Sequence, residues 1–74
     1  MRYLTRDGEQ LIGNTSRQII DALRVKSRTP CRDVLEFMDL VAVNARTQTG
    51  HPVSTRSAEA FLQDLVLAGL IERG

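Results

Sequence analysis

The chain has 74 residues, of which 42% are hydrophobic and 26% are charged, and its formal net charge is +1. This composition excludes a disordered chain and argues against general nucleic-acid binding, which is typical of strongly basic domains. The single cysteine and single histidine exclude an internal disulfide and a four-ligand zinc site.

The N-terminal segment predicts a β-hairpin over about residues 2–13. Asp7-Gly8 lies between two short apolar runs, residues 3–4 and residues 11–12, and Asp-Gly in such a position is a strong hairpin signal. A hairpin alone is marginal in water, so one of its faces must pack on helices.

A first helix is expected over about residues 16–26. Thr15 and Gln18 have the spacing of a capping box, in which the two side chains bond the first free backbone N–H groups of a helix. The buried stripe of this helix is expected to contain Ile19, Ile20 and Leu23.

A second, longer helix is expected over about residues 30–47 and is predicted to be the central helix of the fold. Pro30 suits the first helical position, and Asp33 lies near the positive end of the helix dipole. Gly50 and Pro52 end the helix. The predicted buried face is broad and consists of Val34, Leu35, Phe37, Met38, Val41, Ala42 and Ala45.

A third helix is expected over about residues 57–68, capped by Ser54 or Ser57. Gly69 stands where a left-handed residue ends a helix, and Leu70 is expected to fold back on Leu65 in a Schellman arrangement. The inward-facing residues are predicted to be Phe61, Leu62, Leu65, Val66 and Ala68.

Four cations in the run RVKSRTPCR form the first candidate binding feature. They are Arg24, Lys26, Arg28 and Arg32, and no acidic residue lies among them. Cations suit the last turn of the first helix, but Arg32 lies near the start of the second. The run is either a solvated connector or a site for an acidic partner.

The second candidate feature is a set of aliphatic residues outside the predicted core faces. Leu40 and Val43 project toward the side of the second helix that carries Glu36 and Asp39, and Leu67 lies off the inner face of the third helix. Either the hairpin or the N-terminus covers these residues, or they form an interface, for example in a homodimer.

Catalytic chemistry has little support in the sequence. Cys31 with His51 is an isolated pairing without a supporting motif. Cys31 is expected in the first turn of the second helix, between Arg28 and Arg32, where the dipole and the cations favour a thiolate; the alternative is a small buried residue. We therefore expect no enzyme, no metal and no cofactor.

The C-terminal third of the chain, STRSAEAFLQDLVLAGLIERG, resembles the recognition helix of winged-helix transcription regulators. In that family a Ser/Thr-rich start leads into an aliphatic helix that ends in a Gly-Leu-Ile-Glu-Arg stretch. The resemblance implies that Thr55 and Arg56 approach DNA.

The sequence thus predicts a single small α+β domain over residues 1–74, with an N-terminal β-hairpin packed on three α-helices. The favoured function is a non-enzymatic protein-interaction or adaptor module, whose partner is another protein or a second copy. The alternative is a small winged-helix-like DNA-binding regulator that uses the helix from Ser57. The N-terminus has no apolar leader, and residues 65–71 are too few to cross a bilayer, so we expect a cytoplasmic protein that binds no membrane.

Overall fold

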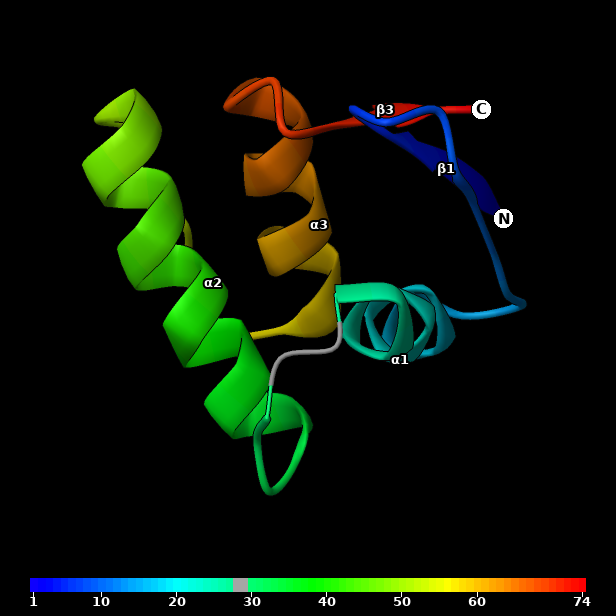
Figure 1. Cartoon of the computed structure of the whole chain (residues 1–74), viewed down its shortest axis with the longest axis horizontal. Helices are drawn as coiled ribbons and strands as arrows, with labels where there is room; N and C mark the ends of the chain where they lie inside the picture. The colour runs from blue at the N-terminus through cyan, green and yellow to red at the C-terminus, as the bar shows by residue number, and fades with distance from the viewer. Residues whose placement is uncertain (28–29) are drawn as a thin grey trace.

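Three helices and one three-stranded antiparallel sheet form the part of the chain that the computed structural model describes, residues 1–27 and 30–74 (Figure 1). The sheet order is β2-β1-β3, and the predicted α+β fold is confirmed. In chain order the elements are β1 (Arg2–Thr5), β2 (Gln10–Ile12), α1 (Ser16–Ser27), α2 (Val34–Thr49), α3 (Ala58–Leu67) and β3 (Ile71–Arg73).

The N-terminal hairpin has the predicted turn. Gly8 adopts a φ of 87°, and its N–H donates to the carbonyl of Thr5 at 3.0 Å. Tyr3 lies opposite Leu11 in the ladder, and both side chains are buried. Because opposed residues project from the same face of a sheet, the hairpin has one face in the core.

Local hydrogen bonds begin α1 and α3 as the sequence predicts. The Thr15 hydroxyl accepts from the N–H of Gln18 at 3.2 Å, while the Gln18 side chain accepts from the N–H of Asn14 at 2.6 Å. The second bond is displaced by one residue from a standard capping box. Ser57, rather than Ser54, caps α3, because its hydroxyl accepts from the N–H of Ala60 at 3.1 Å.

The helix stop after α3 is also confirmed. Gly69 adopts a left-handed φ of 78°, and its N–H donates to the carbonyl of Val66 at 3.0 Å. The N–H of Leu70 donates to the carbonyl of Leu65, also at 3.0 Å. These two bonds define the Schellman motif, which turns the chain from α3 toward the sheet.

Strand β3 is a feature that the sequence analysis missed. It pairs antiparallel with β1, with Ile71 opposite Thr5 and Arg73 opposite Tyr3. Of its three residues only Ile71 is buried, so the strand is too short to produce a recognisable alternation. The pairing makes β1 the middle strand and brings the first and last elements of the chain side by side (Figure 1).

One hydrophobic core joins the sheet to the helices. Its deepest members come from β2, α1, α2 and α3, with Tyr3 and Ile71 added by the other two strands. The side chains that are almost completely excluded from solvent are Phe37, Phe61, Leu11, Ile19, Ile20, Leu62 and Leu65.

The second helix begins four residues later than the sequence predicts and ends two residues later. Asp33 has an extended backbone with φ −154°, and its carboxylate accepts from the N–H of Glu36 at 2.9 Å. Asp33 is therefore the N-cap, and Pro30 is not the first helical residue. Gly50, with φ 73°, ends the helix.

The prediction that the second helix is central is wrong. Helix α2 lies at one edge of the molecule, and α3 lies between α2 and the sheet (Figure 1). Only Phe37, Met38 and Ala45 of α2 are buried, and Leu35, which we expected in the core, is 66% exposed. Because β3 extends the sheet beside α3, the sheet packs on α1 and α3 and leaves α2 with a narrow buried stripe.

The Schellman glycine can be tested by substitution. A Cβ at Gly69 would meet no atom within 4 Å, so the cost of Gly69→Ala is conformational and should be about 1–2 kcal/mol. For a domain of this size each kcal/mol lowers the Tm by about 4–8 °C. Gly69→Asn is the matched control, because asparagine tolerates the left-handed region better than alanine. Equal Tm losses for the two variants in thermal unfolding would contradict this explanation.

Candidate functional site

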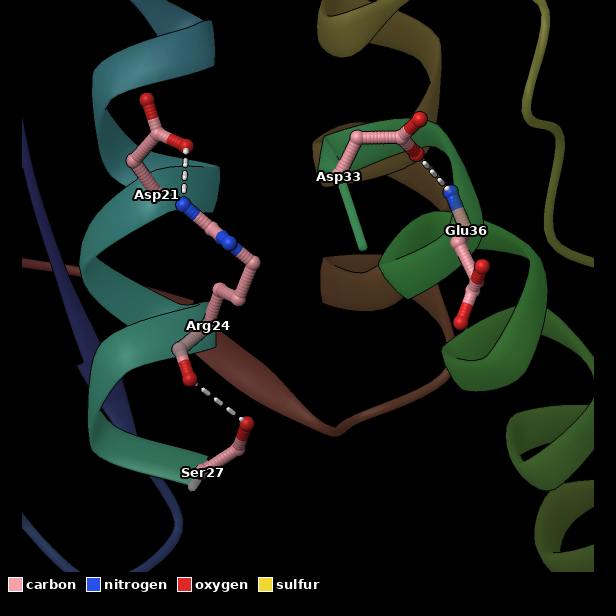
Figure 2. Close-up of polar contacts among 5 residues, drawn as sticks. All are labelled: Asp21, Arg24, Ser27, Asp33 and Glu36. Atoms are coloured by element: carbon pink, nitrogen blue, oxygen red, sulfur yellow. Dashed lines mark hydrogen bonds and ion pairs between the residues drawn. The ribbon is translucent and has the colours of Figure 1, made fainter. Parts of the chain in front are cut away.

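The four predicted cations do not form a shared basic patch among the described residues. Figure 2 shows Arg24 in an ion pair with Asp21, at 3.8 Å, on the surface of α1. In the same view the Ser27 hydroxyl donates to the carbonyl of Arg24 at 3.0 Å. The ammonium of Lys26 lies 3.7 Å from a carboxylate oxygen of Glu9 in the hairpin.

The third described cation, Arg32, also has an acidic partner. Its Nε lies 3.1 Å from a carboxylate oxygen of Glu36, one turn into α2, beside the Asp33 cap seen in Figure 2. Arg28 lies outside the described residues. Each described cation of the run thus pairs with a different acid. The pairs of Arg24 and Arg32 have local helical spacings that the sequence can show, whereas the pair between Lys26 and Glu9 joins distant segments.

The predicted aliphatic residues are accessible to solvent. Leu40 is 40% exposed and Val43 is 65% exposed, so neither the hairpin nor the N-terminus covers them. They lie one turn apart on α2, on the side opposite the buried Met38 and Ala45. Leu67 is 64% exposed, but it belongs to α3, on the side opposite that helix's buried residues. The structure therefore separates Leu67 from the pair on α2.

A groove lies where the N-terminal ends of the three helices meet, and we call it the N-terminal groove. Its volume is about 310 Å³. The lining residues are Arg17, Asp33, Val34, Leu35, Met38, Thr55, Arg56, Ser57 and Ala58. Thr55 and Arg56, the predicted DNA contacts, are therefore together in this groove. The sequence analysis missed Arg17, because only the folded chain brings the start of α1 beside the start of α3.

The charges around the N-terminal groove are not balanced. Arg17 and Arg56 are exposed, and neither has an ion-pair partner among residues 1–27 and 30–74. Asp33 supplies a carboxylate to the lining, but one of its oxygens is bonded to the backbone of Glu36. The same lining also includes four apolar residues, Val34, Leu35, Met38 and Ala58.

The predicted environment of Cys31 is wrong. Because α2 begins at Val34, Cys31 is not in its first turn; it is partly buried and packs against the core. Cys31 precedes the start of α2, whereas His51 follows its end, and the helix between them is about 24 Å long. The structure thus does not bring this pair together. Among the described residues no group of three or more His, Cys, Asp or Glu side chains could hold a metal ion.

The described helices are also too short or too polar for one of them to span a bilayer. No known protein family, curated protein or solved structure matches the chain. Functional inference for this protein therefore depends on its own residues and their arrangement.

The ion pairs of the basic run should contribute little to stability, because exposed pairs are typically worth about 0–1 kcal/mol. We expect Lys26→Ala and Arg32→Ala each to lower the free energy of unfolding by less than about 1 kcal/mol in urea titrations. Leu65→Ala, in the core, should cost about 2–5 kcal/mol. Losses for the two cations as large as the loss for Leu65 would mean that the pairs hold the fold together.

Proposed function

We propose that this protein is a non-enzymatic interaction module that binds a short segment of another protein in the N-terminal groove. The observation that carries the proposal is a groove lined both by apolar residues and by two arginines that have no acidic partner among the described residues. Folding alone requires neither the exposure of Leu35 nor two unbalanced cations. The combination suits a ligand that supplies an aliphatic side chain and a carboxylate.

The size of the groove supports a peptide anchor. A volume of about 310 Å³ is at the lower end of the range for ligand sites, roughly 300–1,000 Å³. It has room for one or two aliphatic side chains of a segment that extends beyond it, as in other recognition of amphipathic peptides. Burial of Leu35 on binding would contribute about 1–2 kcal/mol, at roughly 25 cal/mol per Å² of apolar surface.

The charge of the groove supports an acidic segment. Guanidinium groups bind carboxylates in a planar, bidentate manner, and Arg17 and Arg56 both line the groove. The carboxylate of Asp33, in the same lining, repels a ligand with closely spaced negative charges, such as a phosphate backbone. A segment with one or two acidic residues beside an aliphatic residue satisfies both conditions.

The DNA-binding regulator is the second candidate, because Thr55 and Arg56 line the groove at the start of α3. The exposed residues of α3 are Glu59, Gln63 and Leu67, and none of them is a cation. A helix that enters the major groove reads bases and phosphates through its exposed face. The exposed face of α3 thus favours a protein ligand over a nucleic acid.

Selection from a random peptide library displayed on phage tests the proposal with the whole chain. We expect enriched peptides to carry Asp or Glu next to an aliphatic residue. A synthetic peptide of that sequence should bind the Arg17→Glu and Arg56→Glu variants at least about tenfold more weakly than it binds the wild type. Each charge reversal replaces an attraction by a repulsion. Arg6→Glu, with the same charge change in the hairpin turn, is the matched control and should bind as the wild type does.

The same preparations should be titrated with random duplex DNA at increasing salt. Weak duplex binding that is insensitive to Arg56→Glu is the expected result. Tight duplex binding that weakens steeply with salt and depends on Arg56 would replace the peptide proposal with the DNA-binding regulator. Enriched peptides that bind Arg17→Glu and Arg56→Glu as well as the wild type would refute the N-terminal groove as the docking site.

A further inference from the structure

The outer face of α2 carries a second surface, separate from the N-terminal groove. Four of its residues, Glu36, Leu40, Val43 and Thr47, follow one another at spacings of four, three and four. This is the spacing of a coiled-coil seam, whose residues all face a partner helix. The two central positions are apolar and exposed, and the two outer positions are polar. The seam is therefore short and centred on Leu40 and Val43.

The residues beside this seam carry opposite charges. Asp39 immediately precedes the seam position Leu40, and Arg46 immediately precedes the seam position Thr47. The two side chains consequently lie on the same flank of the seam, about 10 Å apart along the helix axis. Both are exposed, and neither has an ion-pair partner among the described residues.

A second copy of the chain complements this arrangement when the two α2 helices run antiparallel. A two-fold axis between Leu40 and Val43 places Leu40 of one protomer against Val43 of its partner, and the reverse. The same operation places Asp39 of each protomer beside Arg46 of the other, because identical flanks meet in an antiparallel pair. A parallel pair would instead bring Asp39 beside Asn44 of the partner, with no attraction of opposite charges.

We propose that the protein forms a homodimer in which the outer faces of α2 pair antiparallel, with Leu40 and Val43 at the centre and two symmetric Asp39–Arg46 ion pairs at the sides. The seam has two apolar residues per protomer, so the interface is at the small end of specific contacts, below about 1,200 Å², and the dimer is weak. Leu35 lies off the seam. The dimer thus leaves both N-terminal grooves open, at opposite ends of the paired helices, and it does not rest on the peptide proposal.

Sedimentation velocity with charge-reversed variants of the whole chain tests this register, over about 10 μM to about 1 mM, where weak dimers dissociate. The wild type should self-associate with increasing concentration. Asp39→Arg and Arg46→Asp should each raise the dimer dissociation constant by about tenfold or more, because each places two pairs of like charges together. Arg6→Asp, an equal charge change in the hairpin, should leave the constant unchanged.

Two rescues distinguish the antiparallel register from other dimers. An equimolar mixture of Asp39→Arg with Arg46→Asp should recover the affinity, since both pairs between the two variants are again attractive. The double variant Asp39→Arg, Arg46→Asp should dimerise as the wild type does. Val43→Glu should remain monomeric with unchanged far-UV circular dichroism, because Val43 is exposed. A wild type that is monomeric at the highest concentration, single reversals without effect, or a mixture that does not recover would each overturn the proposal.

Discussion

The packing of α3 against α1 and the sheet is the contact on which the rest of the structure depends. Phe61, Leu62 and Leu65 occupy one face of α3 and are almost completely buried, together with Ile19 and Ile20 of α1. Burial of each such side chain is worth about 1.5–3 kcal/mol, against a total stability of about 5–15 kcal/mol for a natural domain. The Schellman turn after α3 also delivers β3 to the sheet, so the same helix fixes both the core and the strand order.

The incomplete burial of α2 accounts for both surfaces that we propose to be functional. The sheet packs on α1 and α3, so α2 contributes only Phe37, Met38 and Ala45 to the buried interior. On its outer face Leu40 and Val43 remain exposed to solvent. Its N-terminal end, capped by Asp33, lines the N-terminal groove together with the starts of the other two helices. A helix packed on all sides would provide neither surface.

Features encoded by neighbouring residues could be predicted from the sequence, whereas features that join distant segments could not. The caps at Thr15 and Ser57 and the left-handed Gly69 depend on bonds within a few residues. The start of α2 was predicted wrongly because Pro30 and Asp33 both give helix-start signals, and the side-chain bond to Glu36 decides between them.

The candidate sites illustrate the same distinction. Helical periodicity placed Leu40 and Val43 on the side of α2 that carries charged residues, but it left open whether the hairpin or the N-terminus covers them. The convergence of Arg17 with Arg56 has no local signal, because it requires the folded arrangement of α1 and α3. The acid that pairs with Lys26 likewise comes from a distant segment, the hairpin.

The central position of β1 has a consequence for the dynamics of the molecule. Because β1 is bonded to β2 on one edge and to β3 on the other, its amides fall into two sets. Some, such as that of Thr5, which donates to the carbonyl of Glu9, depend on the hairpin, and the others depend on the pairing with the last strand of the chain. Closing so long a loop is entropically costly, so we expect the β1–β3 pairing to form after the hairpin. Amide hydrogen exchange along β1 therefore distinguishes loss of the β1–β3 pairing from loss of the hairpin, while the amides of α2 can exchange through local opening at the edge.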